Sequence, residues 1–478
     1  METRNFINGK FINTISKKNI PVLNPANQKI IGNIDEALDD EIDLAFKSAK
    51  NAFDKRILLD MDSKNKSRLM RAIASKLRDY KDEGALILSS ENGKTIEQCK
   101  GEFLGAADTY DYYAGLTDKI ENKIIPSDKD TFNYVILEPF GVSLQIVPWN
   151  YPIVIFASMT AQNLIVGNTM VIKPPELCPI SSNFFGKIFE EIGLPNGVIN
   201  IVHGCGEITG RKLVKHNSVD YIVFTGSPEV ASEILRETSD RIIPTHFELG
   251  GKSAAIIYPD ANIDQAVEST IKGIFKPNAG QICVAMSRVI VHPKIKDEYM
   301  SKLVDKAKKL KIGPGNDANT EVTPLISRAQ IQRVSNYCKS GVQSGATLTL
   351  GGEQNENDEG NYFQPTIFDN VDTKATIAQE EIFGPVTTIF DFNNEEEAIE
   401  IANSTQYGLA SGVFTSDDQK AQWTAERIQA GVIWHNDWFV DGVNLPGGGY
   451  KRSGYGRDGG IDGVYSHGQT KRISKRLI

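Results

Sequence analysis

Cys283 is the first residue whose type and surroundings could support chemistry. It follows Gly280 and Gln281 in the segment FKPNAGQICVA, ahead of the apolar strand pattern SRVIVHP. Glycine lets the backbone approach a ligand closely, and a loop ending at a helix or strand can direct a thiolate and its own N–H at one carbonyl group. From the residues alone two interpretations are open, a nucleophile or a small buried apolar residue. The second is expected for the other cysteines: Cys99, Cys178, Cys205 and Cys338.

A carboxylate and an amide are the next candidates. Glu248 lies in HFELGGKSAA at the end of an expected strand, where α/β folds build their sites. Asn150 lies between two turn signals in VPWNYP, and its amide could donate a hydrogen bond to an oxyanion. Each also has a simpler interpretation, because Glu248 could cap a turn as an exposed charge and Asn150 could merely close one.

Two glycine-containing segments could hold a phosphate. HGCGEITG contains Gly204, Gly206 and Gly210, and the spacing between the last two is one residue longer than in the usual GxGxxG fingerprint. FTGSPEV follows the strand pattern DYIVF and opens a helix, so Gly226 and Ser227 would lie at a helix N-terminus, where free N–H groups and the dipole favour a pyrophosphate. The alternative is an ordinary strand–helix turn.

Alternating strand and helix patterns predict the elements that must position these residues. TMVIKP, GVINIVHG and DYIVFTGS are each followed by a helical pattern, and a second series runs through SAAIIYPD and SRVIVHP. Short apolar strands separated by helices are typical of βαβ units on a parallel sheet, which predicts an α/β fold. Amphipathic helices are expected before them, from Asp40 and from Lys64. The glycine-rich tail LPGGGYKRSGYGRDGGIDG is expected to be an ordered functional loop.

Composition excludes several classes of protein. The 478 residues suggest two to four domains, and a net charge of −9 argues against a general nucleic-acid or anionic-membrane binder. Five cysteines without a CxxC pair and six histidines do not favour a disulfide scaffold or a zinc site, so no metal is expected. Neither a signal peptide nor a transmembrane segment is recognised, and a cytoplasmic protein is expected.

Nearly the whole chain resembles the NAD(P)-dependent aldehyde dehydrogenases. The motifs that carry the resemblance are FINGKFI, NPANQ, VPWNYP, VIKPPE, FTGS, ELGGK, NAGQIC, EEIFGP, YGLASGVFT and PGGGYKRSG. It implies a Rossmann-like NAD-binding domain (1–118 and 138–248), an α/β catalytic domain (249–452), and a small β oligomerisation arm with a C-terminal tail (119–137 and 453–478). The arm would pair the segment near 120–137 with a strand near Thr470, in a homodimer or homotetramer.

The resemblance also implies roles for single residues. Cys283 matches the nucleophile, Glu248 the general base and Asn150 the oxyanion-binding amide. The residues expected to bind the cofactor are Trp149, Lys173, Glu176, Gly226, Ser227, Glu381 and Phe383. Because Glu176 would face the ribose 2′-position, NAD is favoured over NADP.

The implied reaction is NAD-dependent oxidation of an aldehyde to the carboxylic acid. Cys283 would form a thiohemiacetal and then a thioester, which water activated by Glu248 would hydrolyse. Two alternatives are a CoA-acylating semialdehyde dehydrogenase, whose relatives typically replace the ELGGK glutamate, and a non-catalytic NAD-binding scaffold. A thiol-redox protein would need a resolving cysteine near Cys283.

The substrate itself is the least determined feature. Tyr151, Lys276 and Trp438 are candidates for a substrate tunnel, where Lys276 would favour a neutral or anionic aldehyde, while Tyr151 and Trp438 could simply form apolar walls. The chain departs from the family pattern at Gly447, where an aromatic residue is usual, at Asp458, where Glu is usual, and at Ala231, where Gly is frequent.

Overall fold

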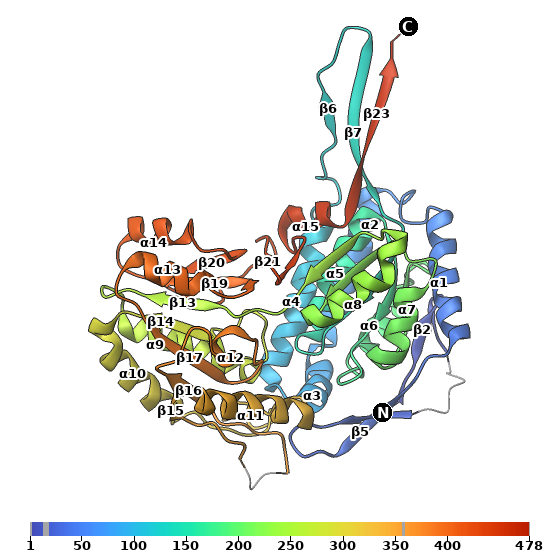
Figure 1. Ribbon diagram of the computed structural model, residues 1–478. Helices are drawn as coiled ribbons and strands as arrows, with labels where there is room; N and C mark the ends of the chain where they lie inside the picture. The colour runs from blue at the N-terminus through green and yellow to red at the C-terminus, as the bar shows by residue number, and fades with distance from the viewer. Residues whose placement is uncertain (1, 13–18, 356–358, 478) are drawn as a thin grey trace.

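The computed structural model describes residues 2–12, 19–355 and 359–477. Their strands form two large sheets, one in each half of the body, and three small ones (Figure 1). The mixed architecture with parallel sheets confirms the predicted α/β class. Within the described ranges, no helix combines the length and apolar character needed to span a bilayer.

The eight-stranded sheet contains the first series of predicted βαβ units. Its order is β22-β12-β11-β8-β9-β10-β2-β3, and the strands from β12 to β10 run parallel. Strand β9 is buried along its whole length, as expected for a parallel strand with both faces covered. The strands are β2 (Asn5–Ile7), β3 (Lys10–Ile12), β8 (Val142–Ile146), β9 (Thr169–Lys173), β10 (Ile199–Ile201), β11 (Tyr221–Thr225), β12 (Thr245–Glu248) and β22 (Gly454–Tyr455).

Helices cover both faces of this sheet. Val171 of β9 shares a core with α1, α7 and α8, whereas its neighbours Met170 and Ile172 share one with α2 to α6, so the strand alternation separates two apolar layers. The helices are α1 (Asp39–Asp54), α2 (Ser63–Asp79), α3 (Lys81–Asn92), α4 (Ile96–Ala114), α5 (Pro152–Val166), α6 (Asn183–Glu191), α7 (Arg211–Lys215) and α8 (Pro228–Thr238). The region from Lys64, expected to be helical, is therefore two helices that meet at Tyr80.

The seven-stranded sheet has the order β15-β16-β17-β14-β13-β19-β20, and only β15 pairs antiparallel. Its strands are β13 (Ala254–Ile257), β14 (Arg288–Val291), β15 (Thr347–Leu350), β16 (Thr366–Asp369), β17 (Val386–Asp391), β19 (Ala410–Phe414) and β20 (Val432–His435). Its helices are α9 (Ile263–Thr270), α10 (Pro293–Ala307), α11 (Arg328–Gln343), α12 (Thr376–Gln379), α13 (Glu395–Asn403) and α14 (Asp418–Ala425).

A three-stranded sheet projects from the body as an arm (Figure 1). Strand β7 (Thr131–Pro139) pairs antiparallel with β6 (Lys123–Ile125) on one side and with β23 (Gly468–Arg476) on the other. The predicted pairing of the 120–137 region with a strand near Thr470 is thus present. After Pro139 the chain bends at Gly141 and leads from the arm into β8.

Residues 453–477 do not form one structural unit. Strand β22 joins the large sheet beside β12, α15 (Gly460–Ser466) packs against α5, and only β23 belongs to the arm. The glycine-rich tail that precedes β23 is ordered, as predicted, and forms the antiparallel edge of the sheet next to Glu248. The division of the chain into two domains stays a prediction. The remaining strands are β1 (Glu2–Thr3), β4 (Asn19–Leu23), β5 (Ile30–Asp35), β18 (Tyr407–Gly408) and β21 (Tyr450–Lys451).

Candidate active site

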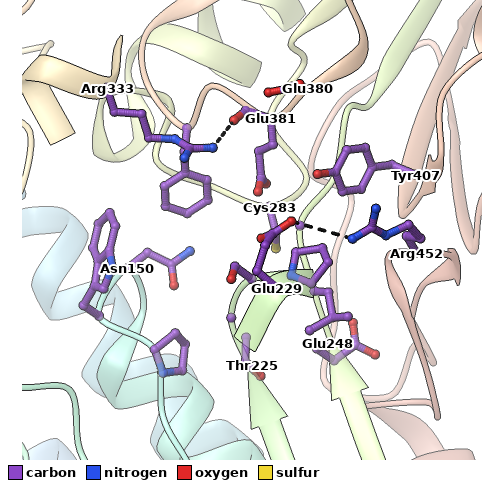
Figure 2. A pocket seen from close by; sticks show the side chains of 18 of the residues that line it. Asn150, Thr225, Glu229, Glu248, Cys283, Arg333, Glu380, Glu381, Tyr407 and Arg452 are labelled. Carbon is purple, nitrogen blue, oxygen red and sulfur yellow. Dashed lines mark hydrogen bonds and ion pairs between the residues drawn. The ribbon is translucent and has the colours of Figure 1, made fainter. Parts of the chain in front are cut away.

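A cavity of about 630 Å³ lies where the ends of β11 and β12 face the loop that precedes β14 (Figure 2). Cys283, Glu248 and Asn150 all line it, so the fold brings the three predicted catalytic residues together. Thr225 and Glu248 end two adjacent parallel strands. The carboxyl ends of such strands are where α/β sheets place their ligands.

The loop that carries Cys283 has a constrained backbone. Asn278, Ala279 and Gly280 have φ values of 47°, 49° and 74°, which are left-handed and costly for the two non-glycine residues. A Cβ on Gly280 would lie 2.4 Å from the oxygen of Gly384, and one on Gly251 would lie 2.3 Å from the oxygen of Cys283. The second glycine of ELGGK is therefore required because the backbone of the Cys283 loop passes directly over it.

Asn150 is buried and tied to the same loop. Its Nδ2 donates a hydrogen bond to the backbone oxygen of Gln281 at 3.3 Å. Asn278 Nδ2 in turn donates to the backbone oxygens of Asn150 and Gln281, both at 3.3 Å. The amide is thus held beside the cysteine loop, as an oxyanion donor must be.

Lys94, which no sequence motif marks, stabilises the loop that carries Asn150. Its side chain is fully buried, and its Nζ donates a hydrogen bond to the backbone oxygen of Asn150 at 2.7 Å. The same Nζ forms an ion pair with Glu102 and lies 4.4 Å from the ring centroid of Tyr151. Glu102 Oε2 also accepts from the N–H of Ile153 at 3.2 Å, in the first turn of α5. No spacing rule links Lys94 to Asn150, because the contact is made between distant segments.

The electrostatics of the cavity favour neutral forms of its acids. Desolvation raises the pKa of Glu248 to about 7, against the opposing effect of His246. Burial raises the pKa of Cys283 to about 12, and the nearby charges of Glu381 and Glu248 add to the shift. The cysteine therefore rests as a thiol, and a base must take its proton before it can attack.

Lys173 and Glu176 form the predicted pair at the end of β9. Lys173 Nζ lies 2.9 Å from Glu176 Oε2, and the N–H of Gly206 donates to Glu176 Oε1 at 3.0 Å. Desolvation opposes ionisation of Glu176, but the charge of Lys173 and the Gly206 N–H hold its pKa below the usual value. The pair can offer both a donor and an acceptor to vicinal hydroxyl groups.

Gly226 and Ser227 lie at the N-terminus of α8, as predicted, and both line the cavity. Ser227 is the N-cap, and its Oγ accepts from the N–H of Val230 at 3.3 Å. The positive end of the helix dipole therefore lies at the cavity wall, which suits an anionic group.

Trp149, Glu381 and Phe383 form the opposite wall. Glu381 Oε1 accepts from the N–H of Gly251 at 3.0 Å, and a Cβ on Gly250 would lie 2.2 Å from its carboxylate. The rings of Trp149 and Phe383 meet edge to face with centroids 5.3 Å apart, and Phe383 has a left-handed φ of 61°. A strained aromatic residue at this place indicates a position fixed for a ligand.

The predicted substrate residues lie elsewhere. Trp438 is fully buried in the core of the seven-stranded sheet, because its ring packs over Gly273 and Gly412 and its Nε1 donates to the oxygen of Val284 at 3.0 Å. Lys276 is 43% exposed and forms an ion pair with Glu321 at 2.8 Å, so its charge is compensated at the surface. Tyr151 is half-buried above Lys94. None of Tyr151, Lys276 and Trp438 lines the described cavity, and their place in a substrate tunnel stays a prediction.

Two of the departures from the family pattern face each other. Gly447 and Asp458 exchange two backbone hydrogen bonds, of 2.8 and 2.9 Å, and so hold the glycine-rich tail in a closed loop near Glu248. Ala231 is buried in α8. Cys99, Cys178 and Cys338 are buried as expected, but Cys205 is only partly buried, close to Glu36.

Several charged residues of the cavity wall were not predicted. Arg333 of α11 donates a hydrogen bond to the backbone oxygen of Glu381 at 2.7 Å, and Arg452 forms an ion pair with Glu229 at 3.6 Å (Figure 2). Arg333 comes from a segment outside the recognised motifs, whereas Arg452 lies within PGGGYKRSG, where nothing in the sequence shows its contact with Glu229. His246 is different, because strand alternation places it on the same face of β12 as Glu248.

A cysteine, an amide and a carboxylate line one cavity at the end of a doubly covered parallel sheet, which is where α/β enzymes place their active sites. Comparison with known proteins then gives the family. The profile described as "Aldehyde dehydrogenase family" matches residues 11–473. The chain belongs to this family.

The relatives agree over nearly their full length. A betaine aldehyde dehydrogenase of Bacillus subtilis is 38% identical over 472 residues, which are 98% of this chain and 96% of that protein. An NAD⁺ complex of the aldehyde dehydrogenase of Bacillus cereus matches with a TM-score of 0.97 and 37% identity, covering 100% of this chain and 97% of the other. A betaine aldehyde dehydrogenase of Staphylococcus aureus, also in complex with NAD⁺, matches with a TM-score of 0.96 and 35% identity, covering 99% of this chain and 94% of the other.

Proposed function

We propose that the protein oxidises an aldehyde to the carboxylic acid with NAD, through a thioester on Cys283 that water hydrolyses. The observation that carries this proposal is that Cys283, Glu248 and Asn150 line one cavity together with most of the residues expected to bind the cofactor, which are Trp149, Gly226, Ser227, Glu381 and Phe383. Family membership and the NAD⁺ complexes of two relatives support it.

The residues present fit a dinucleotide. Ser227 and the N-terminus of α8 would hold the pyrophosphate, and Lys173 with Glu176 would hold the hydroxyls of a ribose. Glu381 and Phe383 would hold the other ribose and the ring, close to Cys283. The bound nicotinamide would supply an acceptor for the hydride that the aldehyde carbon loses.

The first half-reaction depends on Cys283 and Asn150. A base removes the S–H proton, the sulfur forms a bond to the aldehyde carbon, and the carbonyl electron pair moves to oxygen. The Asn150 amide and the N–H of Cys283 would donate to this oxyanion.

The second half-reaction depends on Glu248. A water proton passes to the Glu248 carboxylate, the oxygen of the water adds to the thioester carbon, and the carbon–sulfur bond breaks to release the Cys283 thiolate. The presence of this base beside the nucleophile favours hydrolysis over transfer to CoA. Retention of both groups, together with the cofactor residues, also disfavours a non-catalytic scaffold.

The experiment that tests this proposal is a substrate panel with the purified protein. We expect reduction of NAD by aldehydes without CoA, measured by the absorbance of the reduced cofactor, and formation of the free acid. Activity that depends on CoA would support the acylating alternative, and no turnover with any aldehyde would support the scaffold.

Assembly follows from the arm by the same reasoning. Ile124 and Ile125 of β6 are 69% and 42% exposed, and β6 is an edge strand, so the arm offers an apolar edge for pairing. We infer a homodimer or homotetramer, which sedimentation would measure. A cytoplasmic location stays a prediction.

A further inference from the structure

A second cluster of ionisable side chains lies behind Glu248. Because side chains alternate along β12, His246 and Glu248 point to the same face, and His246 Nε2 lies 3.7 Å from Glu248 Oε1. The same Nε2 lies 3.7 Å from Asp458 Oδ1, so one ring nitrogen faces two carboxylates. His467 completes the cluster, with its ring centroid 5.0 Å from that of His246.

The cluster is buried and its polar atoms are short of partners. His246 is 1% exposed and His467 is fully buried. His467 Nδ1 lies 2.7 Å from the oxygen of Gly463, to which it donates, but neither ring nitrogen of His246 nor Nε2 of His467 has a hydrogen-bond partner among the described residues. Glu248 Oε1 shares this deficit. Buried polar groups are usually paired, so this concentration calls for a functional explanation.

The glycine-rich tail is shaped to admit these side chains. A Cβ on Gly456, whose φ is 104°, would lie 2.6 Å from His246 Nδ1, and one on Gly448 would lie 3.0 Å from Glu248 Oε1. Asp458 is held in the same tail, where its Oδ1 accepts from Gln162 Nε2 at 3.1 Å. The tail therefore places the Asp458 carboxylate near the His246 ring, and the absence of a side chain at Gly456 leaves space for that ring.

We propose that His246 is a positioning residue for Glu248: the charged His246 ring lies 3.7 Å from the carboxylates of both Asp458 and Glu248, and so keeps the Glu248 carboxylate ionised and fixed for the deacylating water. The inference rests on the role of Glu248 in the proposed function. Nothing in the family motif of ELGGK requires a histidine two residues before the glutamate.

The charges around the ring support this assignment. Desolvation disfavours the imidazolium, yet Asp458 and Glu248 together raise the pKa of His246 above its usual value. In return, His246 opposes the desolvation that raises the pKa of Glu248. The other groups facing the cluster are Arg457 in the tail, His467 after α15, Tyr221 of β11 and Tyr113 of α4.

Removal of the imidazole should raise the pKa of Glu248 further, because Asp458 would then repel it without compensation. Deacylation needs the ionised carboxylate, so its rate should fall at neutral pH while the midpoint of its acidic limb moves up. A shift of one pH unit corresponds to a tenfold lower rate on that limb.

The experiment measures deacylation rates in single turnovers across pH for the wild type, His246→Gln and His216→Gln. His216 is the matched control, because it stacks on Phe46 with centroids 4.0 Å apart, on the other face of the sheet. We expect His246→Gln to form the acyl-enzyme but to move the acidic limb up by about one unit, with no shift in the control. An unmoved limb in His246→Gln would overturn the proposal.

Two further measurements cover folding and a competing occupant. If His246→Gln does not fold, nitrogen-15 spectra of the wild-type histidine rings should show a protonated Nε2 on His246 whose titration moves to lower pH in Glu248→Gln; a His246 signal that ignores this change would contradict us. His246, Asp458 and His467 also offer ligand atoms within 4.8 Å of one another. If dialysis against a chelator moves the acidic limb of the wild type, a bound cation sets it and the proposal is wrong.

Failure of this inference is distinguishable from failure of the proposed function. If Glu248→Gln hydrolyses its thioester at the normal rate, the base assignment itself is wrong. If Glu248→Gln accumulates the thioester but His246→Gln leaves the acidic limb in place, only the role of His246 is refuted.

Discussion

Asn150 donates from its Nδ2 to the backbone oxygen of Gln281 at 3.3 Å, two residues before Cys283. The amide assigned to the oxyanion and the loop of the nucleophile are thus joined directly. Lys94 holds the Asn150 loop in place as well, because its Nζ donates a hydrogen bond to the backbone oxygen of Asn150. The distance between donor and nucleophile is therefore set by buried contacts, which is the preorganisation that oxyanion stabilisation requires.

Replacing the nucleophile should abolish turnover without loss of cofactor binding. Cys283→Ala removes only the sulfur, while the groups at Lys173, Glu176 and Ser227 remain in place. We expect less than about 1% of wild-type activity, because covalent catalysis contributes far more than a hundredfold. NAD binding, followed by fluorescence titration, should be nearly unchanged, and substantial residual oxidation would show that Cys283 is not the nucleophile.

The pH dependence of deacylation should follow Glu248. Its pKa is raised to about 7, and only the deprotonated form can accept a proton from water. The deacylation rate should therefore be constant above this value and fall about tenfold for each pH unit below it. A single-turnover rate that stays level down to pH 5 would exclude a base of this kind.

The buried ion pair below Asn150 should matter for stability as well as geometry. Lys94→Met leaves the Glu102 carboxylate buried without its partner, which typically costs about 3–5 kcal/mol. Lys100→Met is the matched control, because Lys100 pairs with Asp82 and Glu97 at the surface, where such contacts contribute at most about 1 kcal/mol. Denaturant unfolding of both variants measures the difference, and equal free energies of unfolding would contradict the assignment.

Cofactor choice should depend on Glu176. Its carboxylate is held beside Lys173 by the Gly206 N–H, and it would meet the extra phosphate of NADP with a like charge. We expect kcat/KM with NAD to exceed that with NADP by tenfold or more, which is about 1.4 kcal/mol, since Lys173 compensates only part of the repulsion. Glu176→Gln should narrow the ratio, whereas equal use of both cofactors by the wild type would refute the prediction.

Sequence reasoning located the residues that belong to compact motifs at strand ends. Cys283, Glu248 and Asn150 carry their signal in neighbouring turn and glycine residues, and the parallel sheet then brings their loops together. Trp438 and Lys276 could not be placed in this way. Whether an indole packs over Gly412 or faces a tunnel, and whether an ammonium meets Glu321, depends on contacts between distant segments.

The contacts of the glycine-rich tail also depend on segments that are distant in the sequence. Gly447 and Asp458 each departed from the family pattern, but their mutual hydrogen bonds appear only when the chain closes on itself. The position of His246 could have been predicted from the sequence, because side chains alternate along the four-residue strand β12 and place His246 on the same face as Glu248. Its partner Asp458 could not be identified in this way, since it lies 212 positions further along the chain.

The most direct test of the whole account is the fate of Cys283 in the Glu248→Gln enzyme mixed with aldehyde and NAD. We predict a burst of about one reduced cofactor per active site, followed by slow turnover, because acylation proceeds and hydrolysis stalls. Mass spectrometry of the quenched enzyme should find the acyl group on the peptide that contains Cys283. Steady turnover at the wild-type rate, with no burst and no acylated Cys283, would contradict the account.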